Sequence, residues 1–213
     1  MEPYRRPIEE LPGDPGRLSL EYSLREPLSG RDDVAAPDEW TVSVRVERFR
    51  NRTVGGVVGS LTLYRLRQDE RFGPHPWEGA EQYDPEFFLA VLGCYDLGRG
   101  GYRREFRDTV TSPDGDLLAL THARLDPEWR GFGLGPVLAS QALWTLAGGC
   151  GAVAVDLRET GLTALCESLG FRRRPRPLGH LLDPASEVAR DAREEQRRRY
   201  DALVDAWRAV HGG

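Results

Sequence analysis

Residues 116–135 read DLLALTHARLDPEWRGFGLG, and they set the architecture that we expect for the whole chain. The first half is a continuous apolar run, which is typical of a strand buried on both faces of a sheet. Glycines then stand at alternate positions, Gly131, Gly133 and Gly135, directly before an apolar helix predicted over 136–147. Backbone N–H groups that converge at the start of a helix bind anions without a lysine, and Arg130 adds a further donor. The segment therefore predicts a phosphate-binding loop between a central strand and a helix.

The sequence on either side predicts antiparallel strands first and a strand–helix–strand unit afterwards. Alternating apolar and polar residues predict three upstream strands, at 18–28, 40–49 and 57–66, the last two forming a hairpin. A helix over 84–97, capped by Asp84, and a strand over 102–111 lead to the central strand at 116–125. Downstream we predict a strand at 151–157, a helix at 160–169, one or two strands within 171–182 and a long charged helix at 186–211. The expected fold class is α+β with a mixed sheet.

These elements suggest one domain with extensions. We expect an irregular arm at 1–16, a domain over 17–185 with an insertion at about 67–98 that shapes a substrate pocket, and an amphipathic helix at 186–213. That helix carries an apolar stripe made of Tyr200, Leu203, Val204, Trp207 and Val210. The stripe needs a partner, either its own domain or a second copy in a homodimer, and the sequence leaves both open.

Composition excludes several classes of protein. All 29 basic residues are arginine, so no lysine is present for a P-loop, a kinase strand or a Schiff base. The three cysteines form no C-x-x-C pair, and the sequence contains neither HExxH nor GxSxG, so we expect no metal site. The net charge of −5 argues against a nucleic-acid partner, although 172–176 and 197–199 are arginine-rich. No stretch is apolar enough to span a membrane and no secretion signal is apparent, so we expect a cytoplasmic protein.

The glycine loop also supports a resemblance to a known family. Arg130–Gly135 resembles the (R/Q)-x-x-G-x-(G/A) motif of the GNAT superfamily of acyl-CoA-dependent N-acetyltransferases, and 165–171, LCESLGF, resembles that family's LYEKLGF segment. The likeness covers about 116–175. It implies a largely antiparallel mixed sheet flanked by helices, with acetyl-CoA as cofactor and an amine acceptor. It further implies that the strand at 117–125 pairs with the pantetheine arm and that its splay from 151–157 holds the acyl group. The residues implied to bind the cofactor are Leu125, Arg130, Gly131, Phe132, Gly133, Leu134 and Gly135.

The catalytic positions depart from the family's usual pattern. Ala119 stands where many members have a strand glutamate, and Cys166 where they have a tyrosine. Histidine is the side chain suited to proton transfer at neutral pH, so His122 is a candidate general base, and the Cys166 thiol is a candidate acid. Each has a structural alternative. His122 would then be a packed histidine of the strand, and Cys166 a small buried hydrophobic residue. Glu159 is a further catalytic candidate, and three other carboxylates stay open as bases: Glu105, Asp108 and Asp116.

Two other functions are compatible with the sequence. The gaps in the catalytic pattern also fit an acyl-CoA-binding regulatory or structural protein that performs no turnover. A dinucleotide-binding protein is the other alternative, with Asp156 at the end of the next strand as the ribose-binding acid. Pro136 stands where that fingerprint needs its last glycine, and five residues separate the strand from Gly131, so both features argue against it.

Overall fold

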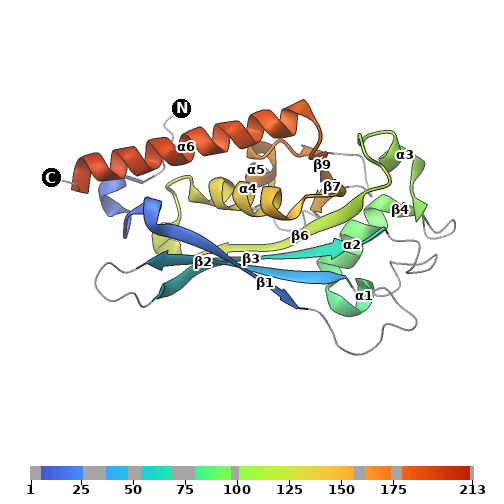
Figure 1. Cartoon of the computed structure of the whole chain (residues 1–213), viewed down its shortest axis with the longest axis horizontal. Coiled ribbons are helices and arrows are strands. Elements are labelled where there is room, and N and C mark those ends of the chain that lie inside the picture. Colours follow the sequence, from blue (N-terminus) through green and yellow to red (C-terminus); the bar gives the residue numbers. More distant parts are fainter. Residues whose placement is uncertain are drawn as a thin grey trace.

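A seven-stranded mixed sheet forms the centre of the computed structural model, which describes residues 6–25, 37–47, 54–68, 80–96, 101–155, 162–173 and 179–211 (Figure 1). The strand order is β1-β2-β3-β6-β7-β9-β8, and only β6 and β7 are parallel neighbours. The strands are β1 (Leu18–Arg25), β2 (Asp38–Glu47), β3 (Val54–Leu66), β6 (Asp116–Leu125), β7 (Cys150–Val155), β8 (Arg172–Arg173) and β9 (His180–Leu182). This is the α+β, largely antiparallel sheet that the sequence predicts.

Helices cover both faces of this sheet. They are α1 (Ala80–Tyr83), α2 (Pro85–Cys94), α3 (Arg104–Arg107), α4 (Leu134–Leu146), α5 (Thr163–Ser168) and α6 (Glu187–His211). Short 3-10 turns η1 (Ile8–Glu10), η2 (Pro15–Arg17) and η4 (Pro127–Trp129), and a small hairpin of β4 (Tyr95–Asp96) and β5 (Gly101–Tyr102), complete the described chain. None of the described helices is both long and apolar enough to cross a membrane.

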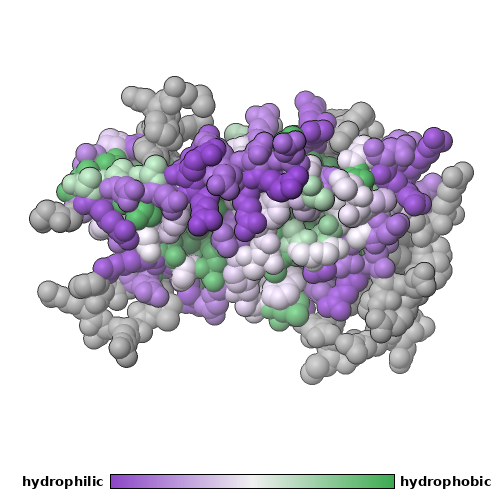
Figure 2. Space-filling model, turned by 45° about the horizontal axis from the view of Figure 1, so that its top comes forward, coloured by the Kyte–Doolittle hydropathy of each residue, from purple (hydrophilic) through white to green (hydrophobic). Residues whose placement is uncertain are grey.

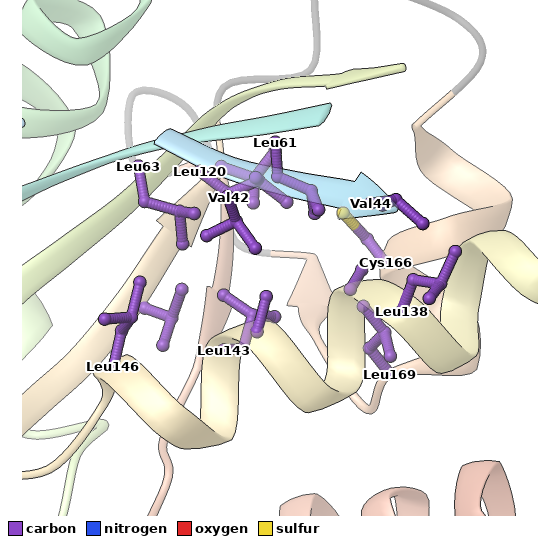
Figure 3. Close-up of a cluster of buried hydrophobic side chains, with 14 of the residues drawn as sticks. Val42, Val44, Leu61, Leu63, Leu120, Leu138, Leu143, Leu146, Cys166 and Leu169 are labelled. Atoms are coloured by element: carbon purple, nitrogen blue, oxygen red, sulfur yellow. The ribbon is translucent and has the colours of Figure 1, made fainter. Parts of the chain in front are cut away.

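The core has two halves, one on each face of the sheet. On one face, Leu143 and Leu146 of α4 point toward leucines and valines of β2, β3 and β6 (Figure 3). On the other face, Phe87 and Val91 of α2 pack against Leu117 and Ala119 of β6. Because β6 is buried on both faces over its first half, it is the central strand that its continuous apolar run predicts.

Helix α6 packs along α4 and the N-terminal turns of its own chain (Figure 1). Tyr200 donates a hydrogen bond to the Pro15 carbonyl at 2.8 Å, and Leu203 and Val204 are buried. The solvent face of α6 is strongly hydrophilic (Figure 2), and Glu195 pairs there with Arg199 at 2.8 Å. Much of the apolar stripe is thus covered within one copy of the chain, and a homodimer stays a prediction.

One predicted element is wrong. We predict a strand over 102–111, whereas Tyr102 ends β5 and the chain then turns into the short helix α3. Tyr102 and Phe106 explain the difference, because their rings stack with centroids 4.3 Å apart, and a spacing of four residues suits a helical turn rather than a strand. The cap of α2 is confirmed, since Asp84 Oδ1 accepts the N–H groups of Glu86 and Phe87.

Several predicted positions lie outside the described residues. They are Asp156, Glu159, 1–5 of the arm, 174–176 of the arginine run, and 69–79 and 97–98 of the insertion, together with the ends of some strands and helices.

Candidate functional site

A groove of about 570 Å³ opens between the second half of β6, the glycine loop, the start of α4 and one side of α5. Its apolar wall includes Val44, Leu61, Leu138, Leu162 and Leu165. Two cationic side chains, Arg124 and Arg130, also line it, and among the described residues no carboxylate does. The groove therefore suits a ligand that is apolar along part of its length and anionic elsewhere.

The glycine loop presents its backbone N–H groups at one end of this groove. Gly131 and Gly133 have left-handed φ angles of 91° and 77°, which a residue with a Cβ adopts only under strain. Gly133 is the N-cap of α4 and makes no side-chain cap. Within the described chain the amides from Gly131 to Gly135 have no hydrogen-bond acceptor. Unsatisfied amides at the start of a 13-residue helix form an anion-binding cradle.

Gly135 gives a separate indication that a ligand approaches here. It is the second residue of α4, and a Cβ built on it would meet no atom within 4 Å. Glycine in a helix is less favourable than alanine, and nothing in the fold requires it at this position. A ligand that comes close to the backbone would require it.

The other predicted loop residues divide between lining the groove and supporting it. Arg130 Nε donates to the Leu125 carbonyl at 2.5 Å, so its side chain ties the loop to the end of β6. Leu125 and Leu134 line the groove with the three glycines. Phe132 does not, because its ring is fully buried in the core, with the Arg6 guanidinium 5.0 Å from its centroid. Phe132 thus anchors the loop, and only its backbone can serve an anion.

The described pairing of β6 with β7 ends beside the groove. Strand β6 pairs with β7 only from Asp116 to Ala119, so the second half of β6 has no β7 partner among the described residues. A β-bulge lies at the same place, because Leu120 pairs with Leu63 and His122 with Thr62, which leaves Thr121 as an extra residue. The bulge shifts the alternation of side chains by one position. Ala123 therefore faces the groove, and His122 faces α2 on the opposite side of the sheet.

His122 meets two carboxylates at the start of α2. Its Nε2 lies 3.2 Å from Oδ2 of the largely buried Asp84, and its Nδ1 lies 3.6 Å from Oε2 of Glu86. The three groups lie within 4.8 Å of one another, close enough to consider a metal ion. Asp84 accepts two helix N–H groups on Oδ1 and faces His122 with Oδ2, so three of its roughly four acceptor sites are in use. The donor set fits a carboxylate-oriented histidine better than a metal centre.

Cys166, another catalytic candidate, does not belong to this cluster. Cys166 is fully buried in the core beside Val44 and Leu138 (Figure 3). Burial raises the pKa of its thiol to about 12, with a smaller contribution from Glu167, so the thiol keeps its proton. Glu159 lies outside the described residues.

Of the three carboxylates that the sequence leaves open as bases, two form ion pairs and the third is exposed. Asp116 is held by Arg65, with Nε to Oδ2 at 2.7 Å. Asp108 pairs with Arg104 at 3.6 Å, and Glu105 is exposed on α3.

Sequence reasoning missed the two acidic partners of His122. Asp84-Pro85-Glu86 predicts only the start of a helix, and 38 residues separate Asp84 from His122. It also missed Arg124 and Ala164 as lining residues of the groove. An arginine at 124, near the end of a mostly apolar strand, is a local indication of a charged ligand on that side.

Comparison with known proteins adds little beyond these observations. No family model matches the sequence, and no curated protein matches it. Among solved structures, the chain is similar to a crystal structure of a mutant agmatine N-acetyltransferase in its apo form, with 20% sequence identity over 66% of this chain and 72% of that chain. The TM-score is 0.38, too low for that similarity to carry an argument. The fold class, an α+β chain whose mixed sheet is flanked by helices and followed by a long C-terminal helix, rests on the structure itself.

Proposed function

We propose that this chain is an N-acetyltransferase that transfers an acetyl group from acetyl-CoA to a primary amine of a small molecule or a protein. The observation that carries the proposal is the groove, which combines an uncapped amide cradle, two arginines and an apolar wall. An anionic, partly apolar acyl-CoA matches these properties, whereas the five-residue gap before Gly131 does not match a dinucleotide loop.

The residues present fit such a ligand. The amides of Gly131 to Gly135 would hold the pyrophosphate, aided by Arg130 and Arg124, and the open space at Gly135 leaves room for a phosphate. The apolar wall and the second half of β6 would hold the pantetheine arm. When bound, acetyl-CoA supplies the thioester that an amine attacks.

His122 is our candidate general base. An amine must lose a proton before it attacks a carbonyl carbon, and an imidazole accepts that proton near neutral pH. The side chain of His122 is 54% exposed, so an acceptor reaches it from solvent on the α2 side of the sheet. The groove lies on the other side of the sheet, so the acceptor amine would have to reach the thioester past the second half of β6.

An acyl-CoA-binding protein without turnover is the second candidate. No carboxylate occurs within 117–125 of the central strand, and the buried Cys166 thiol, with a pKa of about 12, is a poor proton donor. The same groove serves both functions, so turnover decides between them.

Calorimetric titration with acetyl-CoA, CoA and NADH tests the proposal. The variant Ala164→Trp places a bulky ring in the groove from an exposed position on α5 and should abolish binding of both CoA species. Thr163→Trp, on the neighbouring exposed residue that does not line the groove, should leave binding unchanged. If the wild type binds neither CoA species, or binds NADH instead, the proposal is wrong. Release of CoA with a panel of amines then separates an enzyme from a binding protein.

A further inference from the structure

We infer that a second cavity, between α6, α4 and β1, binds a small organic anion that also carries hydroxyl groups. The cavity has a volume of about 890 Å³, within the range of ligand pockets. In the described part of the chain, Leu138 is the one residue that lines both this cavity and the groove beside the glycine loop. The inference is therefore independent of the proposed function.

Three arginines of α6 supply positive charge to the cavity. Arg190, Arg193 and Arg197 line it, and their spacing of three and four residues places them along one face of the helix. The guanidinium of Arg193 lies 4.7 Å from the centroid of the Trp144 ring, a contact that fixes its position. Within the described chain none of the three arginines forms an ion pair, so each is available to a carboxylate or a phosphate.

The length of this stripe favours an organic anion over an inorganic one. Seven residues of helix rise about 10 Å, which is the axial distance from Arg190 to Arg197. Inorganic phosphate meets only part of such a stripe, whereas an organic acid of several carbon atoms extends along it.

A buried amide of α6 lacks a hydrogen-bond donor in the same cavity. Gln196 lines the cavity and is only 2% exposed. Its Nε2 donates to the Ser168 carbonyl at 2.9 Å, whereas its Oε1 has no partner among the described residues. Buried polar atoms are nearly always paired, and an O–H group of a ligand would satisfy this oxygen.

The other lining groups also accept hydrogen bonds. Tyr22 of β1 donates to Thr145 Oγ1 at 3.1 Å, and the Thr145 hydroxyl donates to the Gln141 carbonyl at 2.9 Å. Both hydroxyl hydrogens are thus used inside the protein, and lone pairs remain on both oxygens. The carboxylates of Glu194 and Asp201, which line the cavity from α6, only accept hydrogen bonds.

These two sets of groups define the chemistry of the ligand. The arginines attract an anion, and the acceptors require hydroxyl hydrogens. An anion without hydroxyl groups would leave Gln196 Oε1 unpaired and would meet Glu194 and Asp201 with no hydrogen between them. A neutral sugar would leave the arginines without a partner. A hydroxy carboxylate and a sugar phosphate share the required chemistry.

Calorimetric titration with matched pairs of ligands tests the inference. Citrate differs from tricarballylate only in its hydroxyl group, and ribose 5-phosphate is compared with inorganic phosphate. In at least one pair the hydroxylated anion should bind about tenfold more tightly than its counterpart, and the pair in which it does so distinguishes a carboxylate from a phosphate ligand. Ribose alone should not bind.

Two arginine variants locate the bound anion. Arg193→Gln and Arg197→Gln should each raise its Kd about tenfold, because a charged hydrogen-bond partner is lost. Both residues are exposed, so the melting temperature should stay near that of the wild type. Arg198→Gln is the matched control, since Arg198 pairs with Glu195 at 2.9 Å and does not line the cavity, and it should leave the Kd unchanged.

Gln196→Leu tests the hydroxyl contact. It removes the acceptor and should raise the Kd of the hydroxylated anion to about that of its counterpart, whose own Kd should not change. The variant also loses the hydrogen bond to Ser168, so its melting temperature is measured first. If it does not fold, the arginine variants and the ligand pairs still decide.

Three results would overturn the inference. One is equal affinity, or no binding, for both members of each pair. Another is a Kd that Arg193→Gln and Arg197→Gln leave unchanged, because the anion would then bind elsewhere. The third is competition between the anion and acetyl-CoA, because the arginines would then serve the ligand of the groove. Failure of the wild type to bind acetyl-CoA would overturn only the proposed function.

Discussion

Replacing Gly135 with alanine should make the protein more stable and at the same time weaken its binding of acetyl-CoA. The added methyl group meets no protein atom within 4 Å, and the φ angle of Gly135 is not left-handed. Alanine is favoured over glycine by about 1 kcal/mol in a helix interior and also reduces the entropy of the unfolded chain. In the first turn of α4 we expect a gain of about 0.5–1 kcal/mol, which raises the melting temperature of a chain of this size by about 1–4 °C.

The same methyl group occupies the space that we assign to a phosphate. A hydrogen bond to a charged group contributes about 1.5–3 kcal/mol, and displacing the phosphate from one amide costs about that amount. Since 1.4 kcal/mol corresponds to a factor of ten, the Kd for acetyl-CoA should rise about 10- to 100-fold.

Thermal denaturation and calorimetric titration measure the two effects on the same samples. Gly148→Ala is the matched control, because a Cβ on Gly148 also meets open space but Gly148 follows the other end of α4 and does not line the groove. The control should leave the Kd unchanged. Wild-type affinity in Gly135→Ala would show that no ligand approaches this backbone, and a lower melting temperature would show that the space is not open.

Four further results are expected. Leu143→Ala removes a fully packed side chain between α4 and the sheet and should lower the free energy of unfolding by about 2–5 kcal/mol in urea denaturation, without loss of the fold. Arg124→Gln should weaken CoA binding several-fold at low salt and by less at high salt, measured by titration at two ionic strengths, because a partly exposed charge is screened. The buried thiols should resist Ellman's reagent near pH 8 until the protein unfolds and exposes all three. Because burial raises the pKa of Cys166 from 9.0 to about 12, its contribution to stability is complete below pH 9 and falls as pH rises from there toward 12, which denaturation at several pH values checks.

The parts of the fold that sequence predicts are those set by local spacing. The glycines of 131–135 and the apolar helix behind them are neighbours in the chain, so their geometry follows from residue type. The Asp84 cap of α2 is local in the same way. The strands of the antiparallel hairpin follow from alternation, which needs no knowledge of distant residues.

The parts that sequence does not predict depend on contacts between distant residues. A one-residue bulge in β6 is invisible in a mostly apolar run, yet it turns His122 away from the α4 side and toward α2. Alternation alone also gives no information on α3, where the stacking of Tyr102 and Phe106 decides the conformation. The candidate base therefore came from residue type, and its carboxylate partners only from the three-dimensional arrangement.

The supports of the glycine loop have a consequence for how the protein folds. Arg6 donates hydrogen bonds to the carbonyls of Pro127 and Glu128 across more than 120 positions of sequence, and the Tyr200–Pro15 hydrogen bond spans 185. Closing such long loops has an entropic cost, so contacts of this kind form late in folding. An intermediate that has already built the central sheet would still have an unsupported glycine loop. Refolding experiments should therefore recover secondary structure before they recover ligand affinity.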